Sequence, residues 1–141
     1  MSRNLLRIVL AAALLCGALA TRADDGGIAV IAHPGMSPLD AAVLQRLYTG
    51  RAIEVAGVPA TVVNLPASSG VREHFFAQVL ATDNDKYVAY WTVRRHIGKG
   101  VPPRELDTVT QVIDFVQATP GAIGYIPATE VRPGMNVAYR P

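Results

Sequence analysis

The sequence predicts a single α/β domain of three layers, in which helices cover both faces of a mostly parallel sheet. Three observations predict this class. Short apolar or β-branched runs alternate with longer segments that are apolar at helical spacing. The most apolar runs, 28–32 and 122–126, lack polar alternation, which is typical of strands buried on both faces. Predicted helices separate the strands, and parallel strands need such crossovers.

The first 23 residues are expected to be a signal peptide that is removed. Arg3 and Arg7 come before or at the start of an apolar run, and Ala18-Leu19-Ala20 has the small-x-small pattern of a signal-peptidase site. The apolar run is too short for a membrane-spanning helix. Cleavage is expected after Ala20 or Ala23, which leaves one domain at 24–141 and a periplasmic location.

Composition excludes several function classes. The only cysteine, Cys16, lies in the leader, so the mature domain has no disulfide, thiol nucleophile or thiolate metal site. Cleavage after Ala20 removes Arg3 and Arg7, so the 13 basic residues become 11 and equal the 11 acidic ones. A general nucleic-acid-binding protein would keep a basic excess, so no nucleic-acid partner is expected. No second membrane segment appears either, so the domain is not expected to span a membrane.

The first half of the domain is predicted to contain two strands, each followed by a helix. After the strand at 28–32, a loop begins at His33-Pro34, and Ser37-Pro38 is expected to open a helix that Gly50 ends. A weakly patterned connection leads to a second strand at 61–65. A helix over 69–80 follows, with apolar residues at helical spacing. These residues are Val71, Phe75, Phe76, Val79 and Leu80.

The second half is predicted to contain two helices, a buried strand and an edge strand. An aromatic helix carries Tyr87, Tyr90 and Trp91, whose face is interpreted as core. Asp107 or Thr108 caps the next helix, and residues 122–126 form the buried strand. A short turn or helix near 128–131 and an edge strand at 137–139 complete the domain.

The turn between the second strand and its helix is the main candidate site. Ser68 or Ser69 can cap the helix, and Gly70 leaves its first amides uncrowded. A helix start presents unpaired N–H groups and a positive dipole end, so it can hold an anion. A plain, well-capped helix is the alternative. His33 also follows a strand, so it is expected at the same edge of the sheet, where ligands bind in such folds.

The order of motifs resembles that of periplasmic phosphate-binding proteins of ABC importers, or one lobe of this type II binding-protein fold. The motifs are the helix ending Arg46-Leu47-Tyr48-Thr49-Gly50-Arg51, the Ser69-Gly70 turn, the Tyr90-Trp91 helix, and the run at 120–126. The resemblance covers nearly all of the mature chain. It implies a solute-binding domain of the cell envelope, associated with phosphate transport.

The resemblance also implies where an anion would bind. The family's site has an arginine ahead of a Ser-Gly-Thr sequence at a helix start. Ser69-Gly70 match this sequence, Val71 stands at the threonine position, and Leu65 stands at about the arginine position. Arg72 is the candidate replacement for the missing charge. The expected ligand-binding set is therefore Ser68, Ser69, Gly70, Val71, Arg72 and His33.

Enzymatic and metal-dependent functions are not expected. The three histidines, His33, His74 and His96, are scattered without metal-ligand spacing, and no cofactor motif is present. Ser69 lacks the preceding glycine of a nucleophile elbow. The sequence 94–100 is strongly basic, which suits either a solvated helix end or a second anion or partner contact.

Two functions remain open from the sequence. The first is a periplasmic domain that binds phosphate or another small anion weakly. The second is a non-enzymatic accessory domain that binds an envelope or transporter protein, or a second copy of itself, and has lost the ligand.

Overall fold

The computed structural model describes residues 27–141, so the predicted signal peptide lies outside the described part. A five-stranded sheet forms the centre of the domain, and a separate two-stranded hairpin pairs β2 (Glu54–Val55) with β3 (Val58–Pro59). The strands of the central sheet, from edge to edge, are β5 (Arg104–Glu105), β4 (Thr61–Asn64), β6 (Ala122–Pro127), β1 (Ile28–Ala32) and β7 (Asn136–Tyr139). No helix of this described part is long and apolar enough to cross a membrane.

The sheet is mixed, and four of its five strands run in one direction. β4 pairs in parallel with both β5 and β6, whereas β1 is antiparallel to both β6 and β7. The prediction of a mostly parallel sheet is confirmed, but β1 is not one of its parallel strands. All five residues of β1 are buried, and an apolar run of this kind indicates burial without indicating strand direction.

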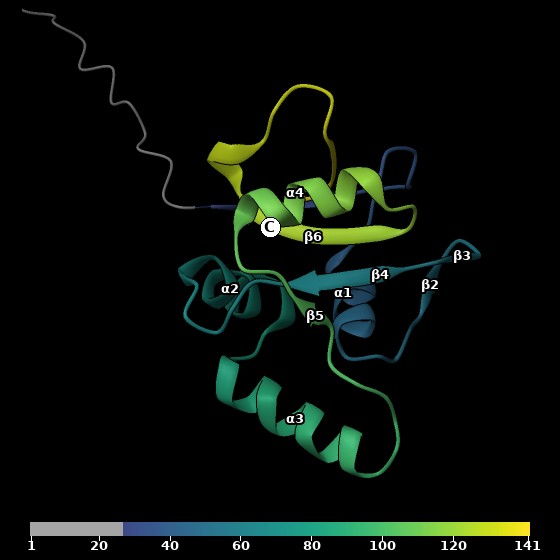
Figure 1. Ribbon diagram of the computed structural model, residues 1–141, viewed down its shortest axis with the longest axis vertical. Coiled ribbons are helices and arrows are strands. Elements are labelled where there is room, and N and C mark those ends of the chain that lie inside the picture. Colours follow the sequence, from purple (N-terminus) through teal and green to yellow (C-terminus); the bar gives the residue numbers. More distant parts are fainter. Residues whose placement is uncertain (1–26) are drawn as a thin grey trace, which may run out of the picture.

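Helices cover both faces of the sheet, as predicted (Figure 1). Two neighbouring residues of β6 contact helices on opposite faces. A Cβ added at Gly124 would lie 2.6 Å from a methyl group of Val112 on α4 (Val109–Ala118). The next residue, Tyr125, faces the opposite layer and stacks on Phe75 of α2 (Gly70–Phe75), with ring centroids 4.0 Å apart. Glycine at 124 therefore lets α4 approach the sheet closely.

Most helix boundaries follow local capping signals, with one correction. The first helix, α1 (Ala41–Tyr48), begins after Asp40, whose carboxylate accepts the N–H of Val43 at 2.8 Å. The sequence predicted an earlier start at Ser37-Pro38. This start is prevented because the preceding Leu39 donates its N–H to Ala138 of β7, which holds the segment extended against the sheet edge.

The remaining helices are close to prediction. α2 continues without a break into a π-helical turn, η1 (Phe76–Leu80), and Ala81 ends it in a left-handed conformation with φ 53°. Thr108 caps α4 by accepting the N–H of Gln111. A short 3-10 helix, η2 (Ala128–Glu130), and the edge strand β7 lie where the sequence placed them. β5 was not predicted.

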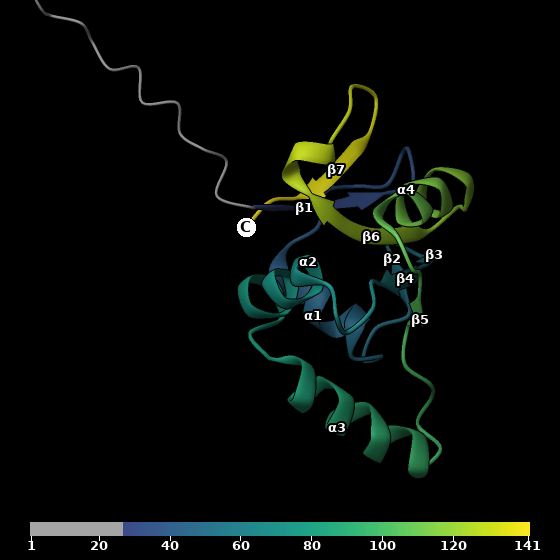
Figure 2. The same cartoon turned by 60° about the vertical axis from the view of Figure 1, so that its left-hand side comes forward.

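The helix α3 (Asn84–His96) lies at one end of the molecule, with α1 and α2 between it and the sheet (Figures 1 and 2). It buries Tyr87 and Trp91, which confirms that the aromatic face is core. Side chains of α3 donate hydrogen bonds to the carbonyl groups of residues 48–50. These carbonyl groups have no donor within α1, because the helix ends there. The donors are Tyr87 Oη and Trp91 Nε1 to Tyr48, Tyr90 Oη to Thr49, and Arg94 Nη2 to Gly50.

Candidate functional site

The candidate site lies at the edge of the sheet where β4 and β6 end. These two strands are parallel, so the turn that follows β4 and Pro127 of β6 share this edge. His33 does not share it. Its N–H donates to Ala122 at the start of β6, 2.9 Å away, because β1 runs in the opposite direction. The expectation that His33 would join the Ser69 turn is therefore wrong, and its Nδ1 instead lies 3.0 Å from the carbonyl oxygen of Val116.

The turn forms the predicted capped helix start. Ser69 has an extended backbone, its N–H donates to Pro66 at 2.9 Å, and its Oγ accepts the N–H of Arg72 at 3.4 Å. Among the described residues, no acceptor bonds the N–H of Gly70 or of Val71. A Cβ added at Gly70 would meet no atom within 4 Å, and Gly70 is exposed. Ser68 is exposed and Val71 half-buried.

Arg72 is held by protein groups on several sides. It is 3% exposed, and its Nη1 donates to the carbonyl oxygen of Leu65 at 3.0 Å and to Glu105 at 2.8 Å. Its Nη2 donates to Asn84 at 2.8 Å, and the guanidinium lies 4.7 Å from the ring centroid of Phe76. The charge that the sequence offered as a replacement for the missing arginine is therefore countered by Glu105. Arg72 ties α2 to β5 and to the start of α3.

A buried polar network lies beside Arg72 at the end of β4. Asn64 is 1% exposed, its Nδ2 donates to Tyr87 Oη at 3.2 Å, and its Oδ1 accepts from Tyr125 Oη at 3.0 Å. Tyr125 Oη in turn accepts the N–H of Leu65. Burial raises the pKa of Tyr87 and of Tyr125, so both hydroxyls remain protonated donors at neutral pH. The network fixes the backbone from which the candidate turn begins.

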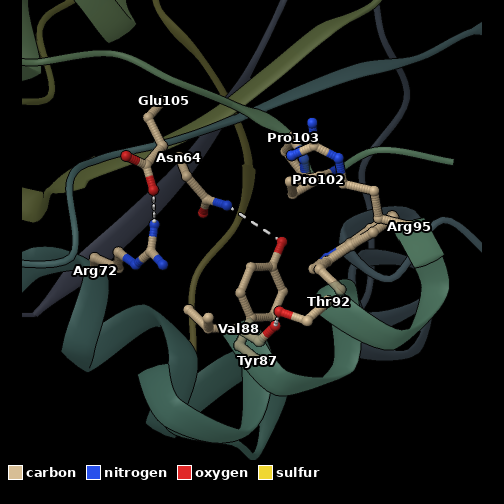
Figure 3. A pocket seen from close by; sticks show the side chains of 10 residues that line it. Asn64, Arg72, Tyr87, Val88, Thr92, Arg95, Pro102, Pro103 and Glu105 are labelled. Atoms are coloured by element: carbon tan, nitrogen blue, oxygen red, sulfur yellow. Dashed lines mark hydrogen bonds and ion pairs between the residues drawn. The ribbon is translucent and has the colours of Figure 1, made fainter.

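An open pocket of about 210 Å³ lies between the end of β4, β5 and α3 (Figure 3). Its polar side consists of the buried network and the Arg72–Glu105 ion pair, and the exposed Arg95 reaches it from α3. Its apolar side consists of Val88, Trp91, Pro102 and Pro103. The pocket can therefore accept a small group with both polar and apolar parts. Arg72 connects it to the Ser69 turn.

Carboxylates lie on the other side of Arg72. Glu73, Asp83 and Asp85 are exposed and line a second hollow of about 220 Å³ together with Ala67, Arg72 and Asn84. The N–H of Lys86, which bonds the Asp83 carboxylate at 2.9 Å, lowers the pKa of Asp83, so this group is charged at neutral pH. These negative charges oppose an anion at the neighbouring helix start.

Sequence reasoning missed four residues of this region: Asn64, Asn84, Glu105 and Tyr125. A buried tyrosine hydroxyl usually needs a hydrogen-bond partner, and a polar residue at the end of a buried strand needs one as well. Those two needs were visible in the sequence at Tyr125 and Asn64. The pairing itself was not, because Asn64 and Tyr125 are 61 positions apart.

A search of protein-family models and of curated proteins gives no match to this chain. Solved structures do match. An ABC-type phosphate transport receptor from Vibrio cholerae aligns with a TM-score of 0.59 and 20% identity over 78% of this chain and 44% of the receptor. A protein described as a phosphate ABC transporter substrate-binding protein with bound phosphate, from Clostridium perfringens, gives 0.63 and 22% over 79% and 44%.

PstS from Borrelia burgdorferi gives a TM-score of 0.56 and 15% identity over 78% of this chain and 45% of PstS. The chain thus spans less than half the length of each of these three structures. The first two are described as a phosphate transport receptor and a substrate-binding protein, and the third by the name PstS. The resemblance noted in the sequence is therefore confirmed at the level of the fold: the chain has the architecture of one lobe of a phosphate ABC transporter substrate-binding protein.

Proposed function

We propose that the chain is a periplasmic, non-enzymatic domain of the solute-binding type that binds phosphate or another small anion weakly at the Ser69-Gly70 helix start. One observation carries the proposal. On a domain with the fold of phosphate ABC transporter substrate-binding proteins, no acceptor among residues 27–141 bonds the N–H groups of Gly70 and Val71, and Gly70 is exposed at the edge where β4 ends. Such groups, with the dipole of the helix behind them, attract negative charge.

The composition of the site supports weak binding. A buried Leu65 and a half-buried Val71 stand where the family has an arginine and a threonine, so one charge and one hydroxyl are absent. Arg72 is paired with Glu105, and three carboxylates lie near it. Without a free cation, an anion at this site is held only by two amide N–H groups and a serine hydroxyl, so we expect a dissociation constant on the order of millimolar.

A thermal-unfolding titration with phosphate tests the proposal. A ligand that binds only the folded state stabilises it by about 1.4 kcal/mol at tenfold its dissociation constant. For a domain of this size, we expect the midpoint of unfolding to rise by roughly 6 °C. Replacing Ser69 by alanine removes both the cap and a ligand for the anion, so the dissociation constant obtained from the titration should rise at least threefold, which is about 0.7 kcal/mol of binding free energy.

Thr108→Ala is the matched control, because it removes the N-cap of α4 and leaves the candidate site unchanged. Both cap variants should lose about 1 kcal/mol of stability. General salt stabilisation acts on both equally. A phosphate response of the same size in Ser69→Ala and Thr108→Ala would contradict anion binding at the helix start.

The second candidate is a protein-interaction domain of the envelope that has lost ligand binding. The observation that favours it is electrostatic: Glu105 neutralises Arg72, and Glu73, Asp83 and Asp85 surround the opposite side of the turn. A midpoint of thermal unfolding that stays unchanged at phosphate concentrations up to about 100 mM would favour this candidate.

A further inference from the structure

The outward face of α3 is uncovered over the whole length of the helix. Of its 13 residues only Tyr87 and Trp91 are buried, and both face α1. Val88 is 48% exposed and Val93 is 61% exposed. The exposed face is formed, in order, by Asp85, Lys86, Val88, Ala89, Thr92, Val93, Arg95 and His96. Apolar side chains thus occupy its middle, and charged or ionisable side chains occupy its ends.

The charges on α3 are separated by sign. Asp83 and Asp85 lie at its N-terminal end together with Lys86, which pairs with Asp83 at 3.4 Å, whereas Arg94, Arg95 and His96 lie at its C-terminal end. Arg94 is held by Gly50, but Arg95 is exposed, and no ion pair is formed by it among residues 27–141. When two α3 helices lie antiparallel, the acidic end of each therefore meets the basic end of the other.

We propose that α3 pairs with the α3 of a second copy of this chain in an antiparallel, two-fold symmetric dimer. The midpoint of the exposed face falls between Ala89 and Thr92. A two-fold axis at this point places Ala89 opposite Thr92 of the other copy and Val88 opposite Val93. The small Ala89 side chain permits a close approach of the two helices. The pairing removes the exposed apolar surface of Val88 and Val93 from water.

The same axis places Asp85 of each copy opposite His96 of the other, with Arg95 as the next residue along the chain and opposite Lys86. Two copies therefore satisfy both ends of the helix at once, which is the self-complementarity that a two-fold interface requires. Lys86, which approaches the partner's basic end, already pairs with Asp83 at 3.4 Å. A second copy fits this face better than a uniformly acidic partner, because an acidic partner would meet Asp83 and Asp85.

The dimer is expected to be weak and sensitive to salt. One pair of short helices buries less surface than the roughly 1,200 Å² that typical specific interfaces exceed. Its charge pairs are solvent-exposed and are screened by added ions. The pairing leaves the Ser69-Gly70 start free, so it does not depend on anion binding there.

Cysteine cross-linking tests the register directly. In a Cys16→Ser background the chain has no other cysteine. We expect a mixture of Ala89→Cys and Thr92→Cys chains to form disulfide-linked mixed dimers under mild oxidation at least five times faster than a mixture of Ala89→Cys and Thr110→Cys chains. Thr110 is an exposed threonine on α4 and serves as the matched control. Equal rates in the two mixtures would overturn the proposal.

Charge reversal gives an independent measurement. By sedimentation equilibrium at low salt, Asp85→Lys should weaken self-association at least tenfold, and the double change Asp85→Lys with Arg95→Glu should restore most of it. Circular dichroism should show unchanged helix content in every variant, since both side chains are exposed. A monomeric parent chain at millimolar concentration, or a double variant as weak as the single one, would overturn the proposal and leave the face to a different partner.

Discussion

The sheet with α4 and α2 differs from α3 in the way that it is held together. In the sheet body, buried side chains from β1, β6, α2 and α4 pack on one another, and Phe75 stacks on Tyr125. α3 buries only two of its side chains, Tyr87 and Trp91, and four of its side chains donate hydrogen bonds to the carbonyl groups at the end of α1. Packing stabilises the first region, and polar anchoring orients the second.

The comparison explains the sequence Leu47-Tyr48-Thr49-Gly50. The carbonyl groups at the end of a helix need donors, and here four side chains of α3 supply them. Gly50, with φ 69°, leaves room for the Trp91 ring, because a Cβ there would lie 2.8 Å from that ring. This motif positions a second helix. We therefore expect the sheet body to unfold as a unit, and α3 to detach while the sheet body stays folded.

The largest effect is expected in the body, at Gly121. It has φ 78°, and an added Cβ would collide with the carbonyl oxygen of Pro59. Gly121→Ala should lower the free energy of unfolding by about 3 kcal/mol or more, from backbone strain and a clash that only backbone movement relieves. Gly134→Ala is the control, since Gly134 has φ 89° but nothing near its Cβ position, and it should lose only about 1 kcal/mol. If urea unfolding gave the same loss of unfolding free energy for Gly121→Ala and Gly134→Ala, the close approach of Gly121 to Pro59 would not be what destabilises the first variant.

A smaller and more local effect is expected at Trp91. Trp91→Ala removes the ring over Gly50 and the donor to Tyr48, and should weaken the attachment of α3 by about 2–4 kcal/mol. Amide hydrogen exchange should then accelerate at 84–96 while β1 and β6 keep their protection. Val93→Ala, at an exposed site on the same helix, is the control. Uniform acceleration across the sheet would mean that α3 and the body unfold together.

The smallest effect under ordinary conditions concerns the tyrosines between the two regions. Burial raises the pKa of Tyr48, Tyr87 and Tyr125, whereas unfolded tyrosines ionise near pH 10. The unfolded state therefore binds fewer protons above that pH, so the stability is complete below about pH 10 and falls as the pH rises toward the raised values. Urea unfolding between pH 8 and 11.5 measures this loss, about 1.4 kcal/mol per pH unit for each buried tyrosine.

Tyr48→Phe sharpens that measurement. It removes one ionisable hydroxyl, which donates to Val63 at 2.9 Å, so stability at pH 8 should fall by about 1 kcal/mol. The decline above pH 10 should become shallower. The same slope in the parent and the variant would show that Tyr48 does not contribute to the alkaline loss.

The candidate site was predictable in part. Ser69 and Gly70 form the capped helix start that their residue types indicate, because a cap is made within a few residues of the chain. The direction of Arg72 was not predictable. It is decided by Leu65, Asn84 and Glu105, which come from three separate segments. The pocket of Figure 3 also depends on segments far apart in the sequence, since β4, β5 and α3 each supply part of its lining.

The sequence by itself determined the type and order of most elements, the helix caps, and the resemblance to one lobe of a binding protein. Hydrophobic periodicity and capping are local properties, so a single sequence displays them. Only the tertiary structure decided that β1 runs against its neighbours, that His33 therefore lies at the far edge, and that Arg72 is paired with Glu105. Burial alone produces an apolar strand, whereas its direction is set by hydrogen bonds to β6 and β7, at the other end of the chain.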